Sequence, residues 1–258
     1  MRVLGFGLFA CILAISAVGA AGAADDEKWS TIKGKVVLTG VIPAQPAIAL
    51  GANPPGCLKG GNPPAEDYIV NPKNKGLKNV FVWIEPAGAK RGTPFPVNMI
   101  HKELVKPAKS IVEIDQPCCN FIPHVLAAQA GQKIVIKNSA TFAHNAKWSS
   151  EKNGDINPLI VAGGKFEFEK ALVLEPSEIT LQCNLHGWMK AHVRVFDHPY
   201  FTVTDDDGNF EIKNAPVGKF NLYVHHPATG WLGGAKGRSG QPLEIKAGGT
   251  DAGTMEMK

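Results

Sequence analysis

The segment Cys183–Met189 places a thiol, an imidazole and a thioether on one short turn, in the spacing Cys-x2-His-x2-Met. Alternating apolar and polar residues in 178–182 and 191–196 predict a strand on each side of it. This arrangement constrains the fold, because the three side chains must then lie together at one end of a sheet. Electron-transfer copper sites use two His and one Cys in a plane, with a long axial Met. The segment therefore predicts most of a copper site, with one His still missing.

The missing ligand is predicted to be His144, which follows the expected strand 133–138. Neighbouring strands of a β-sandwich bring their loops together at one end, so this loop can meet the turn that carries Cys183. Apolar residues near the candidate ligands are expected to keep water away from the metal and to tune its potential. These residues are Phe142, Ala143, Trp148, Leu185 and Trp188.

Several motifs occur in a characteristic order: Phe121-Ile-Pro123, Gly131, the strand 133–138, His144-Asn145 and then the Cys-x2-His-x2-Met turn. Together they resemble the plastocyanin-like cupredoxins. The compact spacing of the turn is most similar to short-loop members such as amicyanin. The resemblance extends from Glu113 to Asp197. It implies a Greek-key β-sandwich with one type 1 copper ion.

The resemblance also implies a role for each matching residue. Copper would be held by His144, Cys183 and His186, with Met189 as the axial ligand. Asn145 would tie the first ligand loop to the Cys loop, and Phe121 and Trp188 would lie next to the ligands. His186 would reach the surface and pass the electron. Gly187 departs from the pattern, since short-loop members often have Pro there.

Two further histidines stand close to these motifs. His124 follows Pro123 directly, and His192 comes three residues after Met189. Each could bind metal or contact a ligand. The alternatives are a partly buried, hydrogen-bonded His124 and a solvent-facing His192 on its strand. The pair His225-His226 is expected to end a strand.

The first residues predict a cleaved secretory leader over residues 1–23. Arg2 precedes an apolar run, and Ala21-Gly22-Ala23 provides a small-residue cleavage site. No other stretch is apolar enough to cross a membrane, so we expect no transmembrane anchor in the mature chain. The expected location is periplasmic or secreted.

Four cysteines remain after cleavage, and an exported protein favours disulfides. If Cys183 binds copper, three are left, and three cannot all pair internally. Cys57 and Cys119 are predicted to form a bridge, with Cys118 free or as the alternative partner. Connectivity cannot be derived from sequence alone, and a bridge between Cys118 and Cys119 stays open.

Short predicted strands separated by Gly and Pro turns indicate an all-β chain. Residues 204–222, with Asp-Gly-x-Phe and Pro-x-Gly-x-Phe motifs, resemble a carboxypeptidase regulatory-like, transthyretin-type sandwich. Within 200–212 we expect a hairpin that turns at Asp207-Gly208. We therefore predict a small sandwich made of residues 25–110 and 198–258, interrupted by a cupredoxin domain at 111–197. The alternative is one enlarged sandwich.

The net charge of the chain and the residues beside Cys183 argue against two classes of function. A net charge of +4 with scattered basic residues argues against nucleic-acid binding. Copper oxidases and nitrite reductases use histidines beside the thiolate to reach a second copper, whereas Gln182 and Asn184 flank Cys183. We therefore expect the chain to be an electron carrier and not an enzyme. Its partner would be a redox protein such as a cytochrome or dehydrogenase. The alternative is copper storage, delivery or sensing.

Overall fold

The computed structural model describes residues 27–42, 44, 66–90 and 92–258. Strands make up nearly all of the regular structure in these ranges, which confirms the all-β prediction. The predicted leader and Cys57 lie outside the described residues. No helix within the described ranges is long and apolar enough to cross a membrane. Short 3-10 turns are found at Val97–Met99, Lys102–Leu104 and Gly234–Ser239.

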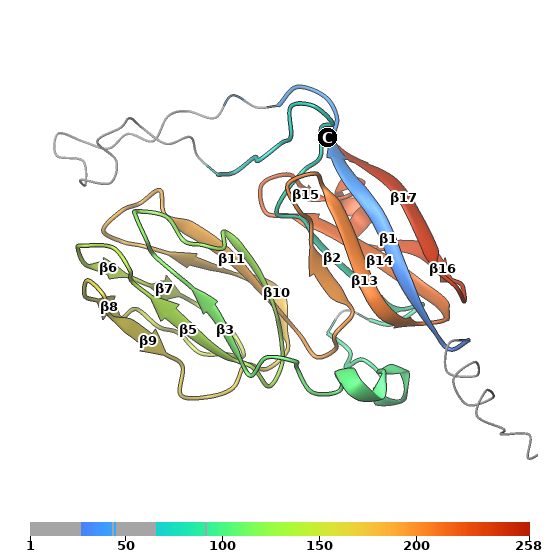
Figure 1. Ribbon diagram of the computed structural model, residues 1–258, viewed down its shortest axis with the longest axis horizontal. Coiled ribbons are helices and arrows are strands. Elements are labelled where there is room, and N and C mark those ends of the chain that lie inside the picture. Colours follow the sequence, from blue (N-terminus) through green and yellow to red (C-terminus); the bar gives the residue numbers. More distant parts are fainter. Residues whose placement is uncertain (1–26, 43, 45–65, 91) are drawn as a thin grey trace, which may run out of the picture.

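The strands between residues 111 and 197 pair with one another and with no other strand of the described residues (Figure 1). One sheet has the order β4 (Val125–Gln129), β11 (Lys190–Phe196), β10 (Glu175–Gln182) and β7 (Lys147–Trp148). A second has the order β3 (Ile111–Ile114), β5 (Lys133–Lys137) and β9 (Lys165–Glu167). The short strands β6 (His144–Asn145) and β8 (Leu159–Ile160) form a two-stranded sheet. We call this part of the chain the central unit.

Apolar side chains from the two larger sheets form the core of the central unit. Ile134 and Ile136 in β5 are fully buried, Val135 between them is 5% exposed, and Lys133 is exposed. Side chains on one face of a strand recur every second residue, so these isoleucines face the same side. They pack in one cluster with Leu181 and Val193 from the other large sheet. The two sheets are therefore held face to face by apolar contacts.

The strands on either side of the central unit in sequence pair together in space (Figure 1). One sheet has the order β13 (Asn209–Pro216), β1 (Trp29–Leu38) and β17 (Thr250–Met257). The other contains β12 (Phe201–Val203), β2 (Phe81–Pro86), β14 (Gly218–His226) and β15 (Gly230–Trp231), and β16 (Gln241–Ile245) pairs with β14. Both sheets contribute to one apolar cluster. We call this part the flanking unit.

The hairpin expected within 200–212 is wrong, although the chain does turn there. The strand β12 pairs with β2, whereas β13 pairs with β1 in the other sheet. The backbone around Gly208 explains the separation, because Val36 N–H of β1 donates to the Gly208 carbonyl at 2.8 Å. Any Cβ at Gly208 would lie 2.1 Å from the Val36 carbonyl oxygen. The turn therefore carries the chain from one sheet to the other.

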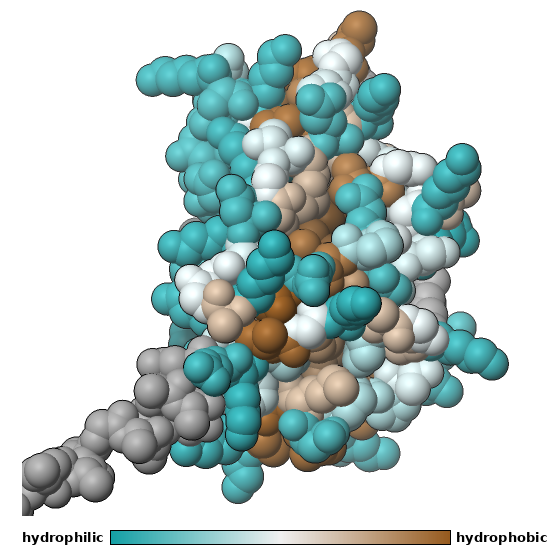
Figure 2. Space-filling model, turned by 90° about the vertical axis from the view of Figure 1, so that its right-hand side faces the viewer, coloured by the Kyte–Doolittle hydropathy of each residue, from teal (hydrophilic) through white to brown (hydrophobic). Residues whose placement is uncertain are grey.

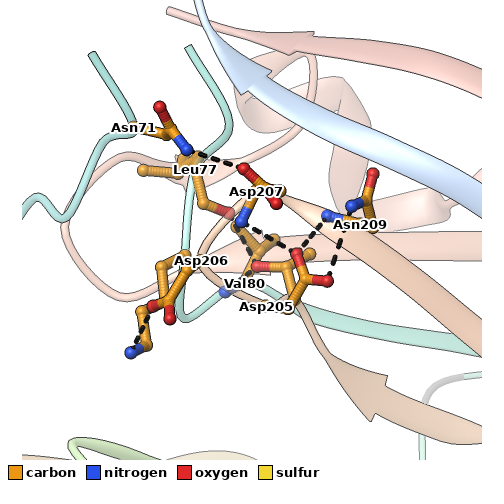
Figure 3. A network of polar contacts seen from close by, with 9 residues as sticks. Asn71, Leu77, Val80, Asp205, Asp206, Asp207 and Asn209 are labelled. Carbon is orange, nitrogen blue, oxygen red and sulfur yellow. Dashed lines mark hydrogen bonds and ion pairs between the residues drawn. The ribbon is translucent and has the colours of Figure 1, made fainter. Parts of the chain in front are cut away.

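Polar contacts fasten this turn to the segment before β2 (Figure 3). The Asp207 carboxylate accepts hydrogen bonds from the side-chain amides of Asn71 at 2.6 Å and Asn74 at 2.8 Å. The Asp205 carboxylate accepts from the backbone N–H groups of Asp207 and Asn209. These hydrogen bonds stabilise the turn, so both aspartates have a structural role in it.

An aromatic cluster joins the two units. Phe81, Trp83 and Tyr223 of the flanking unit pack with Val125 and Phe196 of the central unit. In addition, the guanidinium of Arg194 on β11 lies over the Trp83 ring, 4.9 Å from its centroid. It also lies 5.6 Å and 5.4 Å from the ring centroids of Phe81 and Trp231. A cation over aromatic faces is stabilising, most of all where water is excluded.

The side of the molecule at the right of Figure 1 belongs to the flanking unit. Figure 2 shows hydrophilic side chains along the margins of that face and scattered hydrophobic residues along its middle. The larger apolar side chains of β1, such as Ile32 and Val36, are fully buried. Exposed apolar residues between polar ones are ordinary on protein surfaces.

Replacing Trp83 tests the contact between the units. Trp83→Ala removes a side chain that is 3% exposed and leaves a cavity beside Arg194. We expect the free energy of unfolding to fall by about 3–5 kcal/mol, measured by urea denaturation. The control Val97→Ala, at a side chain that is 70% exposed, should change it by less than about 0.5 kcal/mol. Equal small effects from both variants would contradict this packing.

His198 gives a second prediction, on pH. Burial lowers the pKa of His198 to about 3, and its Nδ1 accepts the backbone N–H of Tyr200 at 3.1 Å. The unfolded chain binds a proton near pH 6.5, so between pH 6.5 and 3 unfolding takes up a proton and stability falls as the pH is lowered. We expect a loss on the order of 1.4 kcal/mol per pH unit from this group.

The matched variant is His198→Asn, which keeps an acceptor for Tyr200 but does not titrate in this range. Urea denaturation of the metal-free protein at pH 7, 5 and 4 measures the slope. The variant should show a shallower decline than the natural protein. Identical slopes would show that His198 is not held neutral in the folded state.

Candidate metal centre

The turn between β10 and β11 carries three of the predicted ligands. Cys183 follows the last residue of β10, and Met189 directly precedes β11. Two backbone hydrogen bonds close the turn, from Cys183 N–H to the Met189 carbonyl at 3.2 Å and from Met189 N–H to the His186 carbonyl at 2.8 Å. The pairing of Gln182 with Lys190 places both ends of the turn at the same edge of the sheet. The side chains of the turn are thereby directed to one place.

The short strand β6 delivers His144 to the same place. It pairs with β8, with His144 opposite Ile160. The side-chain amide of Asn138, at the end of β5, donates to the carbonyls of Phe142 and Ile160 at 2.9 Å and 2.8 Å. This buried amide therefore anchors the loop that leads from β5 to His144.

Three donor atoms converge at this point. Nδ1 of His144 lies 3.1 Å from Nδ1 of His186. The Cys183 sulfur lies 3.8 Å from each of these nitrogens. A metal about 2.0–2.1 Å from nitrogen and about 2.3 Å from sulfur can reach all three atoms at these separations. The three donors fit one ion.

Burial sets the protonation of the two histidines. The pKa of His144 is lowered to about 4 by burial and by the neighbouring His186, and burial also lowers the pKa of His186. Both rings are therefore neutral near pH 7, as a metal ligand must be. Two ring nitrogens that face each other at 3.1 Å need a proton or a cation between them. Two imidazole nitrogens and one cysteine sulfur form a donor set that suits copper.

Met189 and the aromatic residues surround the donors. Met189 is 1% exposed and belongs to the same apolar cluster as Cys183, Phe121 and Trp148. The Phe142 ring lies edge-on to the His144 ring at 4.9 Å. These contacts keep the site dry, and exclusion of water is one means by which a protein tunes a metal's potential.

Asn145 joins the His144 strand to the Cys183 turn. Its side-chain oxygen accepts the backbone N–H of Asn184 at 2.7 Å and that of Leu185 at 3.3 Å. The Cys183 thiol lies 3.3 Å from the same oxygen. The Asn145 amide donates to the side chain of Asn157 at 2.6 Å. One side chain thus holds both ligand segments in register.

Cys119 is a donor that the sequence reasoning did not place here. It is a buried free thiol, so the predicted bridge between Cys57 and Cys119 is wrong. Cys118 is disulfide-bonded instead, with its partner outside the described residues. The physical reason is that Cys119 turns inward: its side chain belongs to the core cluster around Cys183. Its backbone has φ 39°, which lets two adjacent cysteines face different ways.

The Cys119 sulfur lies among the candidate ligands. Ligand atoms of Cys119, His144 and His186 are all within 4.8 Å of one another. Burial and the nearby Cys183 raise the pKa of the Cys119 thiol to about 11. The Trp188 indole N–H donates to the Cys119 carbonyl at 3.1 Å, and the Trp188 ring lies 5.3 Å from the His186 ring. The odd number of cysteines left beside Cys183 indicated that one would remain unpaired, but not that it would lie at this site.

The other predicted histidines lie elsewhere. His192 Nδ1 contacts the Glu178 carboxylate at 2.7 Å, and His225 Nδ1 lies 3.2 Å from the second oxygen of Glu178. The His124 ring packs edge-on against His192 at 5.3 Å. The solvent-facing alternative for His192 is wrong, because its side chain is 13% exposed and β14 of the flanking unit brings His225 against the same carboxylate. The structure does not bring His124 or His192 to the three convergent donors.

Comparison with solved structures finds cupredoxins. A point mutant of amicyanin in its Cu(I) form has 15% identity and a TM-score of 0.29, covering 33% of this chain and 82% of that one. A purple cupredoxin from Nitrosopumilus maritimus has 20% identity and a TM-score of 0.27, covering 33% of this chain and 98% of that one. The copper assignment rests on the donor atoms themselves, since likeness at this level carries no function.

A copper-containing nitrite reductase from Thermus scotoductus also matches, with 20% identity and a TM-score of 0.30. The match covers 33% of this chain but 22% of the reductase. No protein-family profile and no curated protein sequence matches this chain.

Asn145→Ala tests how the site is held. The substitution leaves the backbone N–H groups of Asn184 and Leu185 without their acceptor. We expect unfolding of the metal-free protein to become easier by about 1–3 kcal/mol in urea. The matched control is Asn157→Ala, which removes only the bond to the Asn145 amide. If the control costs as much as Asn145→Ala, the oxygen contacts are not what holds the turn.

Proposed function

We propose that this chain is an exported copper protein with one type 1 copper ion, and that it transfers electrons. The observation that carries the proposal is the convergence of His144 Nδ1, His186 Nδ1 and Cys183 Sγ at 3.1 Å and 3.8 Å. Two nitrogens and one cysteine sulfur, with a methionine thioether as a weaker donor, are the ligand set of electron-transfer copper, and Met189 would supply that thioether. When bound, the ion supplies a one-electron change between Cu(I) and Cu(II).

The protein's own residues hold the donor atoms rigidly and provide a route for the electron to the surface. Asn145 holds the two ligand segments together, and buried apolar residues exclude water from the donors. His144 and Cys183 are buried, while His186 is partly exposed and Leu185 beside it is 57% exposed. An electron is therefore proposed to enter and leave through the His186 edge. A redox protein such as a cytochrome or dehydrogenase would dock there.

Two features support export to the periplasm or the exterior. Residues 1–23 have the pattern of a cleaved leader. Cys118 is disulfide-bonded, and disulfides persist in oxidising compartments. Gln182 and Asn184 beside Cys183 support a carrier rather than an enzyme, since neither side chain is an imidazole that could reach a second copper.

We also propose that the flanking unit is a transthyretin-type sandwich into which the central unit is inserted. The pairing of β1 and β2 with strands that follow residue 198 supports an insertion at residues 111–197. The Arg194 and Trp83 contact supports a fixed orientation of the two units.

Copper storage, delivery or sensing is the second candidate. One observation favours it: the buried Cys119 thiol within 4.8 Å of both histidine donors adds a soft ligand suited to Cu(I). A carrier keeps its ion through many cycles, whereas a delivery protein releases it. The rate of copper loss to a chelator therefore separates the two functions, and rapid loss favours delivery.

The visible spectrum tests the copper assignment. The Cu(II)-loaded mature protein should show an intense thiolate-to-copper charge-transfer band, because Cys183 Sγ is one of the three convergent donors. Cys183→Ser should abolish the band. The control Asn184→Ala changes an exposed neighbouring side chain and should keep it. A colourless natural protein would rule out type 1 copper.

A further inference from the structure

The buried thiol of Cys119 has no role in a site with one cysteine. We propose that Cys119 is a second sulfur ligand of this centre and binds Cu(I) together with Cys183, His144 and His186. The inference rests on the proposed function, because it assumes that the three convergent donors bind copper. It goes further by assigning a donor set of two sulfurs and two nitrogens to the reduced ion.

The position of the Cys119 sulfur is the first reason to assign it to the centre. The ligand atoms of Cys119, His144 and His186 lie within 4.8 Å of one another, and the Cys183 sulfur is 3.8 Å from the same two histidine nitrogens. Both sulfurs therefore stand within a short movement of one ion. Cys119 is 3% exposed, so its sulfur is not available to solvent.

The backbone holds the thiol in this place from two sides. Cys119 is in a left-handed conformation, with φ 39°. Its carbonyl accepts the indole N–H of Trp188, which belongs to the ligand turn itself. The preceding residue, Cys118, is disulfide-bonded. The Cys119 segment and the ligand turn are thus tied together independently of any metal.

The chemistry of the two cysteine sulfurs supports binding of Cu(I), the reduced ion. Thiolates are soft ligands, and Cu(I) is one of the metal ions that they select. Binding requires the thiol to lose its proton to solvent, and no electron is transferred in this step. The competing explanation is that Cys119 only fills the core as a small apolar residue, as buried cysteines often do. A test must therefore separate packing from ligation.

X-ray absorption of the Cu(I)-loaded mature protein counts the sulfur atoms near the metal. Met189 could also contribute sulfur, so the decisive variant is Met189→Leu. We expect two sulfurs at about 2.3 Å in Met189→Leu, which can come only from the two cysteines. We expect Cys119→Val, which keeps an apolar side chain of similar size, to lose one short sulfur relative to the natural protein.

Affinity provides the second measurement. Competition with a chromophoric Cu(I) chelator should show at least about tenfold weaker binding in both Cys119→Val and Cys119→Ser, since each removes one soft ligand. The control Val193→Ala truncates a fully buried residue of the same apolar cluster that carries no donor atom. It should lower stability in urea but leave the sulfur count unchanged and the Cu(I) affinity nearly so.

The outcomes separate this inference from the proposed function. One short sulfur in Met189→Leu, or unchanged affinity in Cys119→Val, would leave a copper protein in which Cys119 only packs. A natural protein that binds no copper at all would overturn both. If Cys119→Val does not fold, the sulfur count in Met189→Leu still decides the question.

Discussion

The hydrogen bonds accepted by the Asn145 side-chain oxygen are the constraint on which the centre depends. His144 and Cys183 lie 39 residues apart in sequence, and β6, which carries His144, does not pair with β10, which ends directly before Cys183. Asn145 bridges them by accepting the N–H groups of Asn184 and Leu185. These bonds help to hold the donor atoms at separations that suit a metal ion. The rest of the central unit serves as the support for that arrangement.

The contact between the two units also constrains the position of the ligand turn. Arg194 on β11 is buried among the rings of Phe81, Trp83 and Trp231, and β11 starts directly after the ligand turn. Movement of the flanking unit would therefore disturb a strand that helps to position Met189. The carboxylate of Glu178, shared by His192 and His225, adds a polar contact across the same boundary.

Much of the candidate site could be predicted from the sequence because its signals are local. Cys183, His186 and Met189 lie on one turn between two alternating strands, and His144 follows a third strand. The predictions were wrong where the structure depends on residues that are distant in sequence. The turn at Gly208 looked like a hairpin, but β1 takes β13 into another sheet. His192 was expected to face solvent, but its side chain is 13% exposed and contacts Glu178, whose second oxygen lies beside His225 of the flanking unit.

The sequence by itself determined the all-β class and the type of donor atoms, since both depend on residue identity and short-range spacing. Only the tertiary structure decided which of the adjacent cysteines faces the donors. That choice rests on the left-handed backbone of Cys119 and on its bond with Trp188, 69 residues away. Sequence spacing carries no information on such a contact, because it forms only when separate strands pack into one core.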